Sequence, residues 1–406
     1  MKRRELFASG AALAAVSLAS AASATPNWKS PGGSSGGGST STAASSPTVF
    51  DYGAVGDGVT DDSAAFSQAL QAAAAQGLKV IVPGATYAIA QPIVFASNGN
   101  ATRLWGLECE GAVLKSSITT GEDVISMTST DVVRYFQVGG GLTIKGSGSD
   151  GRGLHIFAPG TGGAYFYNCT LDSLSVEGVG GDGLLFEGNV FESQVSNSFF
   201  QNCGRNGATF AHSQGGACSS INLIGCYFNQ NARHGMEATN FDGRYGGATD
   251  VRVFGGYCRE NGHFGFRYNN GTAQGAQVTQ VGFENNCTTL APGDPSGAHV
   301  YADVRMQMSA CAGYNEFGGA TNLLRGWFSD LALLDGCSQT CGGAMASTGK
   351  SRLVRVNGSS DGFVLMRGCN GGVAAESGTA CTWRAENCKG PSPLGALSLK
   401  DVVVSA

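Results

Sequence analysis

The side chains best suited to chemistry recur at fixed distances from a series of glycines. These glycines are Gly153, Gly183, Gly207, Gly235, Gly265 and Gly297. The second residue after each glycine is His155, Leu185, Thr209, Glu237, Arg267 or His299. The residue before each glycine is Arg152, Asp182, Asn206, His234, Phe264 or Ser296, and Arg205, Arg233 and His263 stand two residues before theirs. Four of the five histidines therefore fall on or beside one series of positions.

A face rich in imidazole and guanidinium groups suits an anionic sugar chain. The planar fork of arginine matches a carboxylate. In β-elimination, a base removes the proton next to a uronate carboxylate while a cation stabilises the developing charge. Histidine titrates near neutrality and is the natural base. We expect His234 to be this base, with Arg233, Arg205 and Arg267 holding carboxylate groups.

The remaining polar residues of this face receive supporting roles. Glu237 could orient His234 or His263, or act as an acid. Tyr245 could donate a proton to the leaving oxygen. The residues that we expect to bind substrate are Arg205, His155, Arg152, Asp182 and His299.

Other functions fit the same residues. Glycoside hydrolysis needs two carboxyl groups, and Asp182 and Glu237 would lie roughly 9.6 Å apart if two strand spacings separate them. Epimerisation of a polyuronate begins with the same proton abstraction as a lyase. A non-catalytic surface protein could use the basic face simply to hold a polymer. A ladder of polar side chains can also be purely structural, protecting sheet edges from aggregation.

The glycine spacing itself predicts the fold. Successive intervals are 30, 24, 28, 30 and 32 residues, a period typical of solenoids. The first and third residues after each glycine are apolar, in alternation with the polar residue between them, which indicates strands with two inward columns. The density of Gly and Asn disfavours helical repeats. The sequence thus predicts an all-β, single-stranded parallel β-helix.

The first folded segment supports this architecture through a resemblance. Residues 50–66, Phe-Asp-Tyr-Gly-Ala-Val-Gly-Asp-Gly-Val-Thr-Asp-Asp-Ser-Ala-Ala-Phe, and the strand and turn at 80–87 resemble the opening of the pectate-lyase superfamily of right-handed parallel β-helix proteins. Phe66, Ala69, Leu70 and Ala73 form an apolar helical stripe. The resemblance implies an N-terminal α-helix that caps the β-helix. It is specific for fold and weak for activity, because lyases, hydrolases, epimerases and phage tailspikes share this opening.

The chain divides into three segments. Residues 1–24 resemble an export signal, with Arg3 and Arg4 before an apolar run; a twin-arginine and an ordinary secretory signal both fit. Residues 25–47 are a Ser/Gly-rich linker. Residues 48–406 form the β-helix domain, in which no stretch is apolar and long enough to span a membrane. We expect a periplasmic or extracellular protein.

Composition limits the partners and cofactors. A net charge of −5 argues against nucleic acid, whereas an acidic polysaccharide can still bind if Lys and Arg gather on one face. Some pectate lyases use calcium, but Asp242 and Asp250 do not share a strand face, so we expect no cofactor and leave only calcium open. Most of the 13 cysteines should pack in the core as small apolar residues. The better disulfide candidates are Cys337 with Cys341 and Cys381 with Cys388.

Overall fold

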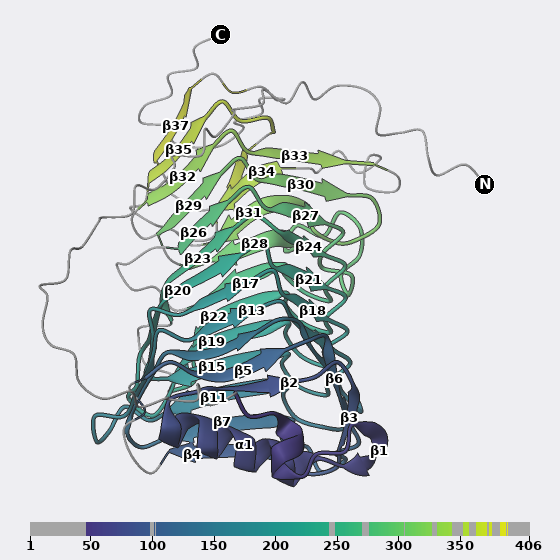
Figure 1. Cartoon of the computed structure of the whole chain (residues 1–406). Coiled ribbons are helices and arrows are strands. Elements are labelled where there is room, and N and C mark those ends of the chain that lie inside the picture. Colours follow the sequence, from purple (N-terminus) through teal and green to yellow (C-terminus); the bar gives the residue numbers. More distant parts are fainter. Residues whose placement is uncertain are drawn as a thin grey trace, which may run out of the picture. The chain divides into compact units, whose positions relative to one another are not determined.

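The computed structural model describes residues 46–97, 101, 103–242, 248–269, 276–303, 305–326, 331–342, 352–356, 363–371, 373–375, 382–386 and 388. These residues form a right-handed parallel β-helix with one capping α-helix, as the sequence predicts. Figure 1 shows the coils stacked in chain order, and in the described residues their strands form three parallel sheets.

Sheet A holds 15 strands among the described residues. Twelve form one path: β2 (Lys79–Val82), β5 (Trp105–Cys109), β9 (Phe136–Gly139), β13 (Thr170–Asp172), β17 (Gln194–Ser196), β20 (Cys218–Ile224), β23 (Thr249–Phe254), β26 (Ala276–Thr279), β29 (Met306–Ser309), β32 (Leu331–Asp335), β35 (Phe363–Arg367) and β37 (Thr382–Glu386). The other three are β8 (Val132–Arg134), β12 (Tyr165–Tyr167) and β16 (Val190–Phe191).

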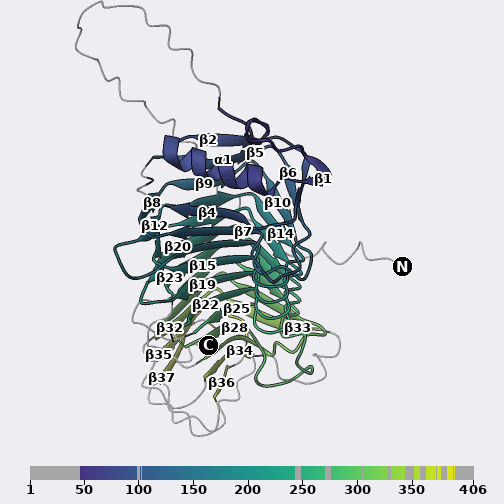
Figure 2. The same ribbon diagram turned by 90° about the horizontal axis from the view of Figure 1, so that it is seen from below.

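Sheets B and C hold 11 described strands each. Sheet B contains β1 (Asp57–Asp61), β3 (Thr86–Ile89), β6 (Ala112–Ser116), β10 (Leu142–Lys145), β14 (Leu174–Glu177), β18 (Phe199–Gln201), β21 (Tyr227–Asn229), β24 (Tyr257–Arg259), β27 (Gly282–Glu284), β30 (Ala312–Asn315) and β33 (Ser338–Cys341). Sheet C contains β4 (Ile93–Ser97), β7 (Ile125–Ser129), β11 (Leu154–Ala158), β15 (Leu184–Gly188), β19 (Ala208–His212), β22 (Met236–Asn240), β25 (Phe266–Tyr268), β28 (Ala298–Ala302), β31 (Asn322–Gly326), β34 (Arg352–Val356) and β36 (Val373–Ala375). Figure 2 shows β7, β15, β19 and β22 of sheet C in that order.

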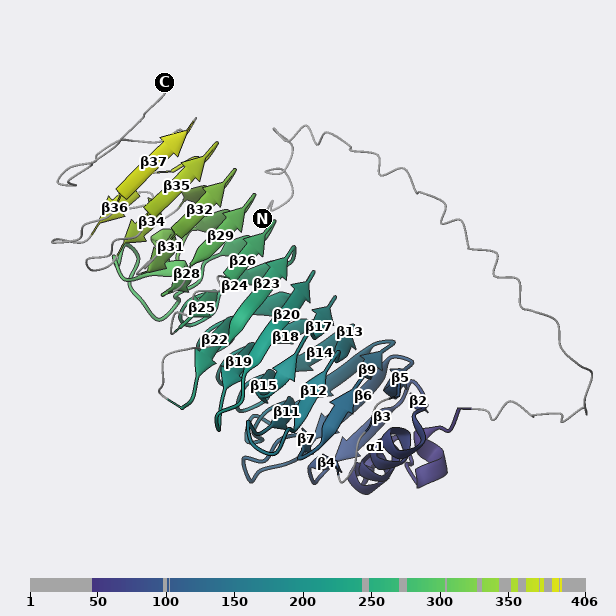
Figure 3. The ribbon, with the colours of Figure 1, turned by 90° about the vertical axis from the view of Figure 1, so that its left-hand side faces the viewer.

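Two short helices close the N-terminal end. The 3-10 helix η1 (Val49–Tyr52) precedes α1 (Ser63–Gln76), which packs against β2, β4 and β5; Figure 3 shows α1 beside β2 and β4. The apolar stripe predicted for α1 is buried, and the helix ends where Gly77 adopts φ +64°. Ser67 Oγ accepts a 2.9 Å hydrogen bond from the Val94 amide. The helix therefore occupies the open edge of β4, which an unpaired strand would otherwise expose.

The landmark glycines are required by close packing between coils. A Cβ on Gly183 would lie 2.6 Å from the carbonyl oxygen of Gly207, and a Cβ on Gly207 would lie 2.6 Å from that of Gly235. A side chain would clash there, so the coils of Gly183 and Gly207 repeat the same tight turn. The columns that follow are inward and buried, as predicted. The core also takes up free thiols, including Cys203 and Cys258. Cys337 and Cys341 are free thiols rather than a disulfide, and Cys381 lies outside the described residues.

A ladder of buried amides runs beneath these turns. Asn231 Nδ2 donates to Asn261 Oδ1 over 2.9 Å, and Asn261 Nδ2 donates to Asn286 Oδ1 over 2.8 Å. Asn286 Nδ2 reaches His299 Nδ1 at 3.1 Å. His299 therefore ends the ladder inside the core and is 0% exposed.

The expectation that His299 faces outward is wrong. Strand β28 pairs with β25 so that Phe266 faces Val300 and Arg267 faces Tyr301. The longer turn before β28 shifts its register by two residues relative to the count from Gly297. Tyr301 therefore takes the outward place, and burial lowers the pKa of His299 to about 3, so that it stays neutral in the core.

The amide ladder provides a test of coil stacking. Asn261→Ala should lower the free energy of unfolding by roughly 2–5 kcal/mol, because it leaves buried polar atoms of Asn231 and Asn286 without partners. Urea denaturation of the two proteins would measure the difference. Gln76→Ala, at an exposed position of α1, should change stability by less than about 0.5 kcal/mol. Equal, small effects of both substitutions would contradict a structural role for the ladder.

Candidate functional site

Three columns of residues cross the coils at the start of sheet C. The outer column comprises Ser126, His155, Leu185, Thr209, Glu237, Arg267 and Tyr301, which are register partners from β7 to β28. The turn column comprises Asp123, Arg152, Asp182, Asn206, His234 and Phe264. From Arg152 onward, the backbone carbonyl of each residue accepts a hydrogen bond from a backbone amide of the preceding coil. The edge column comprises Glu122, Gly151, Gly181, Arg205, Arg233 and His263, joined by amide bonds of 2.6–3.0 Å. The glycine spacing therefore predicted the outer column correctly from His155 to Arg267. The structure places Tyr301, and not His299, next in this column.

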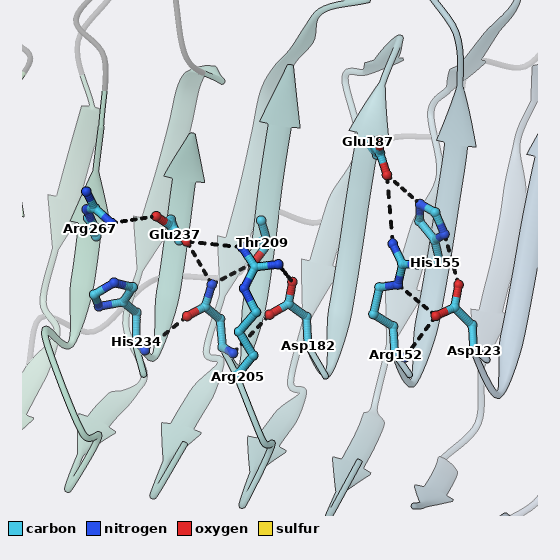
Figure 4. Close-up of polar contacts among 11 residues, drawn as sticks. Asp123, Arg152, His155, Asp182, Glu187, Arg205, Thr209, His234, Glu237 and Arg267 are labelled. Atoms are coloured by element: carbon cyan, nitrogen blue, oxygen red, sulfur yellow. Dashed lines mark hydrogen bonds and ion pairs between the residues drawn. The ribbon is translucent and has the colours of Figure 1, made fainter. Parts of the chain in front are cut away.

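The Glu237 cluster gathers side chains from four consecutive coils, those of β15, β19, β22 and β25 (Figure 4). Arg205 reaches two carboxyl groups: its Nη1 is 3.3 Å from Asp182 Oδ2 and its Nη2 is 3.7 Å from Glu237 Oε2. Arg267 Nη1 lies 3.0 Å from Glu237 Oε1. Asn206 donates its backbone amide to Asp182 Oδ1 and its Nδ2 to Glu237 Oε2, each over 2.9 Å. Two carboxyl groups therefore share one guanidinium and one asparagine.

The cluster is covered rather than open. Glu237 is 3% exposed and Asp182 is 1% exposed, whereas about a third of the Arg205 side chain faces solvent. Burial raises the pKa of Asp182 despite the nearby charge of Arg205. Two of the three arginines predicted to hold a substrate carboxylate, Arg205 and Arg267, thus already contact carboxylates of the protein itself.

His234 lies beside this cluster, but its surroundings make it a poor base. It is 2% exposed and stacks on Phe264 at 5.5 Å, and neither ring nitrogen has a hydrogen-bond partner in the described structure. Burial, with the charges of Arg267 and Arg233, lowers the pKa of His234 to about 2. A base works best with a pKa near the working pH. The ring of His263 lies 5.5 Å from that of His234, and the residue as a whole is exposed. Partial burial of the imidazole, with the charges of Arg233 and Arg267, lowers the pKa of His263.

A second group, the His155 relay, lies on the neighbouring coils (Figure 4). His155 Nδ1 is 3.0 Å from Asp123 Oδ2, and His155 Nε2 is 2.9 Å from Glu187 Oε2. Arg152 contacts the same aspartate through Nε at 2.7 Å and through its amide at 2.9 Å. An imidazole thus bridges two carboxylates, and a guanidinium is held beside them.

The relay holds its charges by mutual pairing. Burial opposes ionisation of Asp123, but the bonds from His155 and Arg152 outweigh it, so its pKa is lowered. The pKa of Glu187 is lowered for the same reason, with His155 as its main partner. Burial alone would lower the pKa of His155, yet its two carboxylate partners raise it. The relay therefore favours a protonated imidazole between two carboxylates.

The structure divides the predicted residues into groups. Asp182, Arg205, Glu237 and Arg267 meet in the Glu237 cluster, and Arg152 and His155 meet in the relay. Arg233 and His263 occupy the edge column, and His234 is buried behind them. Tyr245 lies outside the described residues.

Asp123 and Glu187 were missed by the sequence reasoning. Asp123 occupies the turn-column position of a coil that has Val124 where the others have glycine, so no landmark marked it. Glu187 is the next outward residue along β15 after Leu185. Following each strand two residues further would have found Glu187.

The described residues contain no group of three or more His, Cys, Asp or Glu side chains arranged to hold a metal ion. In the same part of the chain no helix has the length and apolarity needed to cross a membrane.

The relay predicts a pH dependence of stability. The raised pKa of His155 stabilises the fold below its unfolded value of about 6.5, and this contribution is lost as pH rises through the folded pKa. The lowered pKa values of Asp123 and Glu187 stabilise the fold above about pH 4, and this contribution is lost as pH falls through their folded pKa values. The advantage of the wild type over His155→Gln should therefore be largest between about pH 4.5 and 6.5.

Urea denaturation of both proteins across the pH range would measure this profile. His212→Gln is the matched control, because burial lowers the pKa of His212 and that substitution should favour the variant at acid pH. A pH-independent difference for His155→Gln would contradict a charged relay.

Sequence comparison identifies a family whose pattern matches this chain. The pattern of the family described as rhamnogalacturonase A/epimerase, pectate lyase-like, matches residues 48–313, more than half of the chain. The pre-neck appendage protein of Bacillus phage phi29 is 29% identical over 209 residues, covering 44% of this chain and 22% of the phage protein. The chain thus spans about a fifth of the length of that relative.

Solved structures share the fold. The A-module of mannuronan C-5 epimerase AlgE4 from Azotobacter vinelandii superposes with a TM-score of 0.50 and 14% identity, covering 88% of this chain and 100% of the module. The catalytic unit of an alpha-1,3-glucanase from Streptomyces thermodiastaticus gives 0.53 and 16%, covering 88% of this chain and 68% of that unit. At these identities the likeness shows the fold alone. On the match over residues 48–313, this chain belongs to the rhamnogalacturonase A/epimerase family of pectate lyase-like proteins.

Proposed function

We propose that this chain is an exported enzyme that cleaves a glycosidic bond in an acidic polysaccharide, with Asp182 and Glu237 as the reacting carboxyl groups. The observation that carries the proposal is their contact with one guanidinium, that of Arg205. Hydrolysis of glycosides uses two carboxyl groups in unlike protonation states. The family match supports a role on polysaccharides, and the epimerase and the glucanase of similar fold are named for reactions on polysaccharides.

Each carboxyl group has a role that suits its surroundings. Asp182, whose pKa is raised by burial, protonates the leaving oxygen. Glu237, in contact with Arg205 and Arg267, activates a water or attacks the sugar carbon, the two routes open to a carboxylate pair. The partly exposed Arg205 side chain covers both groups, so the substrate reaches them as that side chain turns aside and contacts the sugar.

The edge column supports an anionic substrate. Arg233 and His263 follow Arg205 on consecutive coils, joined by backbone bonds of 2.8 and 2.6 Å. Among the described residues, Arg233 forms no ion pair with a carboxylate. Its planar fork therefore suits a carboxylate on the polymer.

A conservative pair of substitutions tests the hydrolase. Asp182→Asn and Glu237→Gln should each lower the rate of new reducing ends by about 10²–10⁴-fold, measured on a panel of acidic polysaccharides and accompanied by denaturation curves to verify folding. The wild-type rate should fall as pH rises through the pKa of Asp182, because the acid must be protonated. Glu192→Gln, which changes an exposed carboxylate in the bend directly after β16, should retain the rate. Full activity in both site variants would exclude this carboxyl pair.

Proton abstraction is the second candidate, and the exposed His263 favours it. A neutral His263 imidazole, whose pKa is lowered by partial burial and by the charges of Arg233 and Arg267, could act as a base while the arginines stabilise the uronate carboxylate. This step fits a lyase or an epimerase, with His263 replacing the buried His234 as the base.

The two chemistries give different products. A lyase produces the ultraviolet absorbance of an unsaturated uronate, and His263→Gln should reduce it about 10²-fold or more, whereas Asp182→Asn should affect it less. An epimerase gives no new ends but changes the uronate composition seen by proton NMR. New reducing ends without ultraviolet absorbance, unaffected by His263→Gln, would reject proton abstraction.

A further inference from the structure

A pocket lies at the N-terminal end of the outer face of sheet C, away from the Glu237 cluster. Its volume is about 350 Å³. The lining residues are Pro92, Val94, Gly121, Glu122, Asp123, Ser126 and Arg152. None of these except Arg152 was assigned a role from the sequence, and the proposed reaction uses none of them.

The floor of the pocket continues the outer column. Val94 on β4 pairs with Ser126 on β7, which pairs with His155 on β11. The side chain of Val94 is an unusual element of the column because it is apolar and 44% exposed. The pocket lies beside β7, and Asp182 directly precedes β15. These two strands are two strand spacings apart, or roughly 9.6 Å. A polymer lying along the columns could therefore occupy the pocket and the proposed reaction site together.

The polar wall of the pocket is fixed by the His155 relay. Asp123 is occupied by Arg152 and by His155 Nδ1, at 2.7 and 3.0 Å. This holds the Arg152 guanidinium in place while about a third of that side chain remains exposed. Glu122 is exposed beside it, with Oε2 accepting a 2.7 Å bond from Thr120. The wall thus offers a rigid donor, Arg152, next to carboxylate acceptors.

The charge of this wall differs from that of the other end of the face. Glu122 and Asp123 contribute two carboxylates against the single guanidinium of Arg152. In the edge column, Glu122 is followed by two glycines and then by Arg205, Arg233 and His263. The face is therefore acidic beside β7 and basic beside β19 to β25.

We infer that the pocket is a binding site for a sugar unit of the polymer that carries no negative charge. The inference rests on the proposed function, because it presumes that a polysaccharide lies along the outer column. The carbon–hydrogen face of such a sugar would pack on Val94 and Pro92, and its hydroxyls would donate to Glu122 and accept from Arg152. A uronate would instead bring its carboxylate to a wall with excess negative charge. Pockets of this kind combine apolar contact with a few fixed polar groups.

Binding without turnover tests the pocket separately from the reaction. Calorimetry on the full-length Asp182→Asn protein would compare uncharged probes, the tetrasaccharides of mannose, xylose and glucose, with the tetrasaccharide of galacturonic acid. We expect the Val94-dependent part of the binding to be stronger for at least one uncharged probe than for the uronate, which can also bind at the basic edge column. Val94→Trp, which fills the pocket from an exposed position, should weaken that binding at least tenfold. Glu122→Lys should shift the preference toward the uronate, whereas Glu110→Lys, the same charge change at an exposed turn elsewhere, should not.

The outcomes separate this inference from the proposed reaction. Val94-dependent binding of an uncharged probe supports the pocket even if Asp182→Asn and Glu237→Gln leave catalysis intact in the activity assay. The inference is overturned if the uronate binds best in a Val94-dependent way, if Val94→Trp changes nothing, or if no uncharged probe binds. Any of these results leaves the carboxyl pair to be judged by the activity assay alone.

Discussion

The close approach of successive backbones at the landmark glycines is the constraint on which the site depends. At Gly183 and Gly207 a carbonyl oxygen of the next coil lies 2.6 Å from where a Cβ would stand, so the coils that carry these glycines share one form of the turn before sheet C. Amide bonds on both sides of each glycine then hold the turn and edge columns in register. Side chains separated by about 30 residues in sequence become neighbours at roughly 4.8 Å spacing.

That spacing determines how charge can be arranged. Two like charges about 4.8 Å apart repel by roughly 3–4 kcal/mol at an effective dielectric constant of about 20. Cations on adjacent coils of one buried column are therefore destabilised unless carboxylates lie between them. Glu237 stands between Arg205 and Arg267, and Asp123 stands beside Arg152. The predicted basic face therefore consists largely of two salt-bridged groups, and among its described arginines Arg233, in the edge column, has no carboxylate partner.

The fold and the face were predictable from the sequence because both follow from local repetition. Gly153 to Gly265 mark one turn in each coil, and the outer column from His155 to Arg267 follows by counting. Counting fails where the repeat changes length, so the two extra residues before β28 place His299 in the core. It also fails where a coil lacks its glycine, as at Val124, which conceals Asp123.

Protonation states could not be predicted, because they depend on burial and on partners in other coils. A histidine and an arginine adjacent in sequence suggested a base and its cation, yet His234 is enclosed by Phe264 and lies near three groups that oppose its protonation. His155, in an equally buried place, has the opposite shift because carboxylates from the coils before and after it meet both ring nitrogens. The same residue type on the same face is thus made non-basic at one coil and cationic at another by the identity of its axial neighbours. The chemistry of this face is therefore set between coils, and a substrate that spans several coils would meet a different charge at each one.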